Sequence, residues 1–103
     1  MQPGYVVIWT YVVKPESIAE FEAAYHSDGE WAAFFRRSPD HLKTEFLRDE
    51  HVPHRYTTID YWSSKEAYLA FRAQWREEYD RFDRKCDEWT SEETHLGTFI
   101  PFG

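Results

Sequence analysis

Residues 5–13 read Tyr-Val-Val-Ile-Trp-Thr-Tyr-Val-Val, an apolar run that only Thr10 interrupts. β-Branched and aromatic residues in such a run favour a strand, and the following Lys14-Pro15 is expected to end it. Both faces of this strand are apolar, with Val7, Trp9, Tyr11 and Val13 on one and Val6, Ile8 and Val12 on the other. The run therefore predicts a strand that is covered on both sides.

The sequence after this strand has the spacing of helices. Ser17 and Glu20 form a capping-box pair that opens a predicted helix over residues 16–26. Ser27 and Glu30 repeat the spacing and open a second, short amphipathic piece. We therefore expect a helical segment that is split in two.

Three further stretches have the alternation of strands. Residues 42–48 and 56–62 alternate in polarity and are separated by a loop that contains Pro53, which predicts two antiparallel strands. Residues 94–101 alternate in the same way and predict the last strand.

The longest helical pattern begins with Ser63 and Glu66, a third capping-box pair. Large apolar or aromatic residues then recur every three or four positions, at Tyr68, Phe71, Trp75, Tyr79, Phe82, Cys86 and Trp89. This single stripe predicts one long helix, and leaves open whether the helix bends at its middle.

The element order is strand, helix, strand, strand, helix, strand, which is typical of the α+β, ferredoxin-like βαββαβ fold. We expect residues 1–103 to form a single domain. Helices cover only one face of such a sheet, and a second copy that presents the same apolar face is the simplest cover for the other. The sequence therefore predicts a homodimer with two packed sheets, a dimeric α/β barrel.

Charge and composition limit the possible partners. The chain has 12 Lys and Arg against 19 Asp and Glu, and this formal net charge of −7 disfavours binding to nucleic acid or an anionic membrane. Residues 5–13 are too few to span a bilayer, and the start of the chain does not resemble a secretory leader. With Cys86 as its lone cysteine, the protein is expected to be cytoplasmic. Its many aromatic rings suit a pocket for a planar ligand.

These features together resemble the antibiotic biosynthesis monooxygenase family of dimeric α/β-barrel proteins. The resemblance extends over about residues 5–102 and rests on the element order, on residues 15–21, on residues 56–68 and on Gly97 in the last strand. It implies the ferredoxin-like fold and a homodimer. In the members that oxidise aromatic polyketides, it also implies a reaction with molecular oxygen that uses neither metal nor flavin. We therefore expect no cofactor, and a small aromatic molecule as the partner.

The same resemblance points to particular residues. Trp62 and Tyr68 match the Trp and Tyr that bind or deprotonate the phenolic substrate in that branch. Thr58 stands where that branch has an Asn, and Phe82 stands where it has an Arg. Arg72 and its neighbour one turn later, Arg76, are the cations that could replace that Arg if the helix presents them to the cavity.

A second branch of the family degrades haem, using an Asn on the first strand, the same Trp, and a helical His ten residues later. This chain keeps Trp62, but Arg72 occupies the His position and residues 5–13 contain no Asn. Haem degradation is therefore the less expected function.

The expected catalytic residues are Trp62, Tyr68 and Asp60. Trp62 ends a strand and Tyr68 lies on the first turn of the next helix, so the two are placed to clamp a flat aromatic, with the phenol as hydrogen-bond donor or base. Asp60 lies on the same side of the strand as Trp62 and is a candidate proton acceptor. The structural alternatives are core packing for the two rings, and a pair with Arg48 or Arg55 for the carboxylate.

Four further residues are expected to contact the substrate, namely Trp9, Thr58, Arg72 and Trp75. No metal site is expected, because His51 and His54 lie in a loop without an obvious third ligand. Cys86 lies in the apolar stripe and is expected to be a small buried hydrophobe. The sequence contains no phosphate-binding loop, nucleophile elbow or HExxH motif.

Two functions follow. The first is a cofactor-independent monooxygenase in which a phenolic or anthrone-like substrate stacks on Trp62, Tyr68 assists its deprotonation, and the resulting carbanion donates an electron directly to oxygen. The second is a non-catalytic, small-molecule-binding or stress-associated dimer that has the same barrel without the chemistry.

Overall fold

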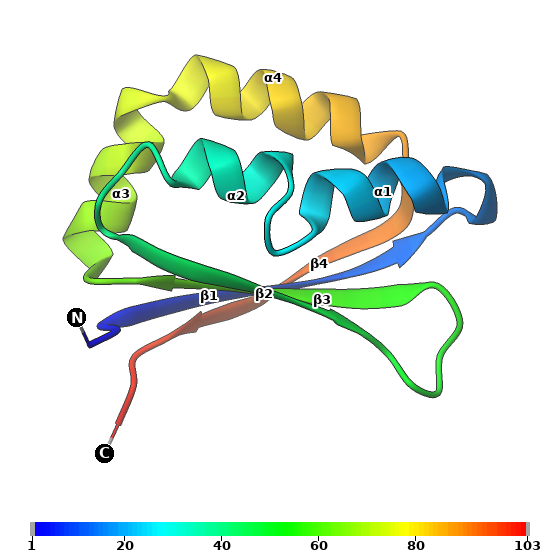
Figure 1. Ribbon diagram of the computed structural model, residues 1–103, viewed down its shortest axis with the longest axis horizontal. Coiled ribbons are helices and arrows are strands. Elements are labelled where there is room, and N and C mark those ends of the chain that lie inside the picture. Colours follow the sequence, from blue (N-terminus) through cyan, green and yellow to red (C-terminus); the bar gives the residue numbers. More distant parts are fainter. Residues whose placement is uncertain (1, 103) are drawn as a thin grey trace.

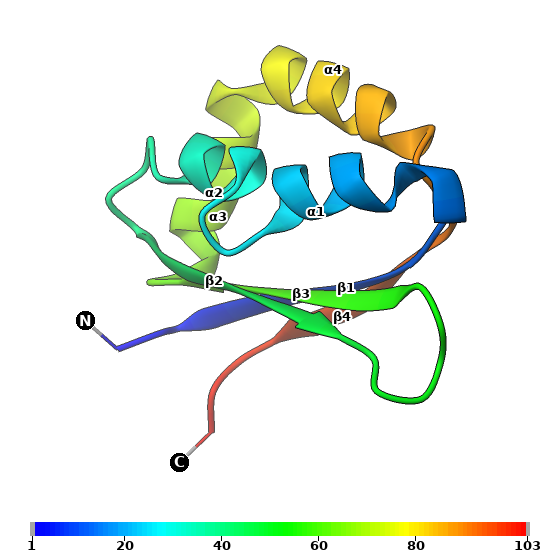
Figure 2. The same cartoon turned by 45° about the vertical axis from the view of Figure 1, so that its right-hand side comes forward.

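A four-stranded antiparallel sheet carries all of the helices on one of its faces (Figures 1 and 2). The structure is a computed structural model that describes residues 2–102. In chain order the elements are β1 (Tyr5–Val13), the 3₁₀ turn η1 (Pro15–Ser17), α1 (Ile18–Tyr25), α2 (Glu30–Phe35), β2 (His41–Arg48), β3 (Arg55–Trp62), α3 (Lys65–Gln74), α4 (Arg76–Asp87) and β4 (Thr90–Phe99). Within residues 2–102, none of the helices is both long and apolar enough to cross a membrane.

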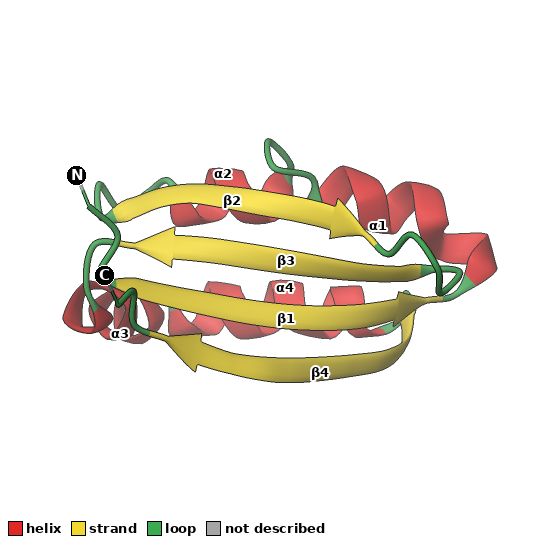
Figure 3. Cartoon of the chain, turned by 90° about the horizontal axis from the view of Figure 1, so that it is seen from below, coloured by secondary structure: helices red, strands yellow, loops and turns green. Residues whose placement is uncertain are grey.

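The strands lie in the order β2-β3-β1-β4, and each is antiparallel to its neighbours (Figure 3). This is the order of the ferredoxin-like fold, so the predicted fold class is confirmed. The two central strands are the most apolar, and their register pairs Ile8 with Ile59 and Val7 with Asp60.

Three inward-facing rows of side chains cross the sheet and form the floor of the site. The row at one end joins His41, Trp62 and Tyr5, and the next joins Thr44, Asp60 and Val7. The third row joins Phe46, Thr58 and Trp9. Because side chains alternate along a strand, Asp60 and Trp62 share this face, as the sequence predicts.

The long helix predicted after residue 63 is interrupted. The backbone leaves helical geometry at Trp75 (φ −110°, ψ 25°), which divides the stripe between α3 and α4. The amide of Trp75 still bonds the carbonyl of Phe71, and that of Tyr79 bonds the carbonyl of Trp75. The break lets α4 turn and run back over the sheet (Figure 2).

Two other boundaries differ from the prediction. β4 begins at Thr90 rather than at residue 94, because pairing with β1 satisfies the backbone of this polar stretch. Ser64 rather than Ser63 caps α3, accepting a hydrogen bond of 3.1 Å from the amide of Ala67. The hydroxyl of Ser63 instead donates to Asp40 at 2.6 Å.

The core between helices and sheet is built from aromatic rings. Trp62, Phe21, Val13 and Cys86 are its largest fully buried side chains. Phe21 stacks on Tyr25 with 4.1 Å between ring centroids. Pairs of this kind add about 0.5–1.5 kcal/mol each beyond the burial of their area. This agrees with the composition, in which the 20 Phe, Trp and Tyr residues outnumber the 13 Leu, Ile and Val residues.

Within residues 2–102, the other face of the sheet has no second layer (Figures 1 and 2). Ile8 and Ile59 lie at its centre and are half-buried, while Leu47, Leu96 and Phe99 are exposed. We call this surface the open face.

Candidate functional site

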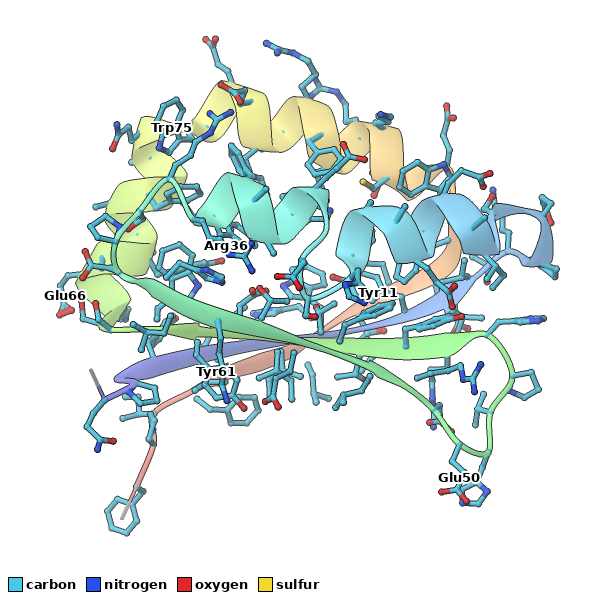
Figure 4. The ribbon with its side chains drawn as sticks, in the orientation of Figure 1. Tyr11, Arg36, Glu50, Tyr61, Glu66 and Trp75 are labelled. Carbon is cyan, nitrogen blue, oxygen red and sulfur yellow. The ribbon has the colours of Figure 1, made fainter. Side chains whose placement is uncertain are left out.

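A narrow cavity lies between the inner face of the sheet and the helices. Its volume is about 40 Å³. The lining residues are Val7, Trp9, Tyr11, Tyr25, Trp31, Phe35, Thr44, Thr58, Asp60, Trp62, Tyr68, Tyr79, Asp83 and Glu93. Figure 4 shows one of them, Tyr11, between the sheet and the helices. Rings form most of the wall, and the few polar groups come from β2, β3, β4 and α4.

Five of the seven candidates from the sequence line this cavity: Trp62, Tyr68, Asp60, Trp9 and Thr58. They come from β1, β3 and the first turns of α3, and the β1–β3 pairing brings them together. The geometry therefore gathers the three residues expected to be catalytic around one space.

Trp62 lies at the end of β3, where other aromatic rings pack against its indole. It meets Tyr68 edge to face, with 5.3 Å between centroids and 69° between planes. His41 and Phe35 pack against it at 5.1 and 5.6 Å. The side chain is 0% exposed, and its Nε1–H has no hydrogen-bond partner within residues 2–102. An indole donor without a partner beside a cavity suits a ligand oxygen.

Tyr68 and Arg72 form a pair one helical turn apart on α3. Arg72 Nη1 donates to the hydroxyl oxygen of Tyr68 at 2.8 Å, and its guanidinium lies 3.8 Å over the ring of Tyr79. Burial by itself lowers the pKa of Arg72, but the facing phenols of Tyr79 and Tyr68 raise it above its ordinary value. The guanidinium therefore remains charged beside the phenol.

Asp60 binds two residues of the neighbouring strand β2. Its Oδ1 accepts a hydrogen bond of 2.5 Å from the Thr44 hydroxyl and lies 3.0 Å from His41 Nε2. The predicted alternative, a pair with Arg48 or Arg55, does not form; Arg55 instead bonds Asp49 at 2.8 Å.

His41 was not among the expected site residues, because the sequence left open whether its side chain enters the cavity. A register irregularity between His41 and Lys43 turns it inward. The signal in the sequence was limited to a histidine at a strand start. Thr44 was visible as an inward position of β2, but its link to Asp60 depends on the register of β2 against β3.

Trp75 requires a correction, because it does not line the cavity. It lies at the break between α3 and α4, away from the sheet (Figure 4), with the Arg37 guanidinium 4.6 Å over its ring. Trp75 still packs against the edge of the core, with 6.5 Å between its ring centroid and that of Phe71. Arg72 also lies outside the lining and reaches the cavity through Tyr68 and Tyr79.

Phe82, at the position where the resemblance implies an Arg, packs away from the cavity. Its ring stacks on Trp31 with 4.3 Å between centroids. Thr58, at the Asn position, has its hydroxyl 3.4 Å from that of Tyr11. These two positions supply packing and one internal hydrogen bond.

Three carboxylates gather beside the cavity, Asp83 and Asp87 from α4 and Glu93 from β4. Their oxygens lie within 4.8 Å of one another. Burial, together with the charges of Asp83 and Asp87, raises the pKa of Glu93 to about 7. This cluster makes the region of the cavity near β4 anionic above neutral pH.

Two other groups from the sequence stay outside the site. His51 and His54 are exposed in the β2–β3 loop. Cys86 is buried, and burial raises the pKa of its thiol to about 11. The cysteine therefore behaves as a small hydrophobe rather than as a nucleophile.

The chain is similar to known proteins over most of its length. A family profile described as antibiotic biosynthesis monooxygenase matches residues 4–85. SnoaB, a cofactor-independent oxygenase from Streptomyces nogalater, has a similar structure at 21% identity, with a TM-score of 0.77 over 99% of this chain and 96% of that one. A search among curated proteins returned no significant match.

Two more solved structures share the fold. A candidate antibiotic biosynthesis monooxygenase from Bordetella bronchiseptica is 19% identical, with a TM-score of 0.76 over 99% of this chain and 100% of that one. The protein PA3566 from Pseudomonas aeruginosa is 17% identical, with a TM-score of 0.74 over 100% of this chain and 98% of that one.

Proposed function

The chain belongs to the antibiotic biosynthesis monooxygenase family, and from this premise we propose that it is a cofactor-independent monooxygenase of a phenolic or polyketide-like aromatic molecule. The observation that carries the proposal is the meeting of Trp62, Tyr68 and Asp60 around one ring-lined cavity. A similar fold in SnoaB, described as a cofactor-independent oxygenase, supports the same class of reaction.

The substrate of this proposal has an acidic C–H or O–H beside an aromatic ring. Asp60 accepts the proton, and the electron pair of the broken bond remains on the substrate. Tyr68 donates a hydrogen bond to the enolate or phenolate oxygen that forms, and Arg72 supports the charge from behind the phenol. The ring and the free Nε1–H of Trp62 hold the plane and one oxygen of the substrate.

The substrate anion then reacts with molecular oxygen. One electron passes to oxygen, and the resulting radical and superoxide combine to a peroxide. Loss of water from the peroxide converts a ring CH₂ to C=O, so that one oxygen atom enters the product and the other leaves as water. The substrate is the reductant, so the balance requires no added electron donor.

Binding requires the cavity to widen. At about 40 Å³ it has room only for molecules of the size of water, whereas a cavity that binds benzene measures about 150 Å³. Trp9, Tyr68 and Tyr79 are half-buried side chains of the wall, and their displacement would enlarge the space without moving the sheet. The proposal therefore includes an adjustment of these rings when the substrate enters.

We also propose the homodimer. Ile8 and Ile59 pair at the centre of the open face, which none of the described helices covers. A second copy with the same face would bury these side chains and give the two-sheet barrel. In this arrangement the catalytic cavities lie on the outer, helix-covered sides.

The test is oxygen uptake with dithranol, a dihydroxyanthrone, after subtraction of the uncatalysed rate. We expect uptake by the wild-type protein and a loss of about 100-fold or more in Trp62→Phe and Tyr68→Phe, since each removes a group that contacts the reacting anion. Tyr56→Phe is the matched control, because its hydroxyl bonds Glu22 outside the cavity. Wild-type turnover in both site variants would reject the proposal.

A second candidate is a binding protein without chemistry. The packing of Phe82 on Trp31 favours it, since no cation replaces the Arg at that position. In that case the protein binds dithranol or its anthraquinone product, and neither is consumed under air.

A further inference from the structure

A buried His–Asp–Thr network supports the cavity from β2. The side chain of His41 is 1% exposed and that of Asp60 is 13% exposed. His41 Nε2 lies 3.0 Å from Asp60 Oδ1 and 3.1 Å from the Thr44 hydroxyl, which itself donates to Asp60. Two polar side chains, His41 and Thr44, thus converge on one carboxylate oxygen of Asp60.

The network determines the protonation of the imidazole. An ionised carboxylate only accepts hydrogen bonds, so His41 Nε2 carries the hydrogen and donates it to Asp60. Nδ1 is buried and has no partner within residues 2–102. A hydrogen on Nδ1 would be a buried donor without a partner. The imidazole hydrogen that the geometry supports is therefore the one on Nε2.

The same network orients Asp60. Both donors bind Oδ1, and within residues 2–102 no hydrogen bond involves Oδ2. Asp60 lines the cavity, whereas His41 does not. Oδ2 is therefore the oxygen that is free to meet a ligand.

The register irregularity at residue 42 is what makes this arrangement possible. Thr44 lies directly opposite Asp60, and a regular β2 would place Leu42 rather than His41 on the inner face beside it. The extra residue turns His41 inward against Trp62 and Phe35, whose rings hold the imidazole at 5.1 and 5.4 Å. Irregularities of this kind often re-aim a side chain beside a functional site.

We infer that His41 is a positioning residue for Asp60, holding its carboxylate with Oδ2 toward the cavity as the proton acceptor. This inference rests on the proposed function. In the step, the substrate C–H or O–H bond breaks, a new O–H bond forms at Oδ2, and the electron pair stays on the substrate. His41 keeps its own proton throughout. The proton on Oδ2 later leaves with the reduced oxygen as water.

Other ionisable groups face Asp60 from two more elements. The charge of Asp60 contributes to raising the pKa of Tyr11 on β1 and of Tyr79 on α4. Burial raises the pKa of each phenol above its ordinary value, so both remain neutral in the working range. Of the ionisable groups His41, Tyr11 and Tyr79, His41 is the one that hydrogen-bonds to Asp60.

The experiment compares His41→Leu and His41→Gln by the pH dependence of oxygen uptake with dithranol. We expect His41→Leu to lower kcat roughly 10- to 100-fold, as is usual when a partner that orients a functional group is lost, with KM within about threefold. The acid limb of its profile should move to higher pH, because the carboxylate loses a donor that stabilises its charge. Gln places an amide N–H near the position of Nε2 and should restore most of the rate.

The matched control is His51→Leu, at an exposed loop position. This variant should leave the rate of oxygen uptake and its pH profile unchanged. A His41→Leu variant that folds and has the wild-type rate and profile would overturn the inference, while leaving the proposed function intact. Thermal unfolding of both variants establishes that they fold.

A second readout does not depend on turnover. Histidine side-chain NMR at neutral pH should show His41 as the Nε2–H tautomer, with a signal that shifts in Asp60→Asn. The Nδ1–H tautomer, or an unshifted signal, overturns the inference even if dithranol is oxidised. If the wild-type protein takes up no oxygen, the proposed function fails, and this spectrum alone decides the placement of His41.

Discussion

Arg72 donates a hydrogen bond of 2.8 Å to the hydroxyl of Tyr68, one turn earlier on α3. The hydroxyl oxygen is thus occupied as an acceptor, which leaves its own hydrogen free to point elsewhere. No ion pair between Arg72 and a carboxylate forms within residues 2–102. The groups that its guanidinium contacts are the phenols of Tyr68 and Tyr79. The pairing places a positive charge behind the phenol of Tyr68, which lines the cavity together with Asp60.

Arg72→Met should reduce turnover of dithranol about 10- to 100-fold, the range expected when a hydrogen bond from a charged donor is lost. Methionine retains much of the apolar stem but removes the guanidinium that lies over the ring of Tyr79. Oxygen uptake measures the effect. Arg81→Met on the exposed side of α4 is the control, and equal activity in the two variants would show that Arg72 takes no part.

The double variant Ile8→Lys/Ile59→Lys should be monomeric. The two side chains pair at the centre of the open face, and burying two ammonium groups against a second copy is strongly unfavourable. Native mass spectrometry should find a dimer for the wild type and a monomer for the variant. Leu69→Lys, at a position 50% exposed on α3, should remain dimeric. A monomeric wild-type protein contradicts the dimer.

Alkylation of Cys86 by iodoacetamide at pH 8 should be slow in the native protein. A thiol whose pKa is raised from 9.0 to about 11 has about 100-fold less thiolate at this pH, and burial restricts access further. Mass spectrometry of the labelled protein follows the reaction. Labelling in denaturant should be rapid, and equally rapid labelling of the folded protein would contradict a buried, inert thiol.

Glu93→Gln should stabilise the protein at pH 8 and have little effect near pH 4. Because folding raises the pKa of Glu93 from 4.5 to about 7, its favourable contribution is complete below pH 4.5 and is lost as the pH rises through 7. Removing the charge beside Asp83 and Asp87 should raise Tm by about 2–4 °C at pH 8, an amount kept small because water screens this partly exposed group.

Thermal unfolding at the two pH values tests this prediction. Glu92→Gln is the matched control, since Glu92 is exposed and lies outside the three-carboxylate cluster. A gain of equal size at both pH values, or an equal gain in the control, would argue against a raised pKa at Glu93.

Several features of the site follow from local sequence alone. The apolar run at residues 5–13 identified the central strand β1, and the alternation in residues 56–62 placed Asp60 and Trp62 on one face. The six-residue step from Trp62 to Tyr68 placed the phenol on the first turns of α3, beside the indole. These predictions hold because a strand and a helix each impose a fixed period on their own side chains.

The tertiary structure determined the features of the site that do not follow from the period of a single strand or helix. Trp75 belongs to the same apolar stripe as Tyr68, yet at the break between α3 and α4 it lies outside the cavity and contacts Phe71 and Arg37. His41 has no inward place in a regular strand, yet one irregularity of β2 places it on Asp60. Helix breaks and strand register depend on contacts between segments far apart in the chain. A local pattern therefore determines which residues share a face, and only the packed structure determines which of those faces meet.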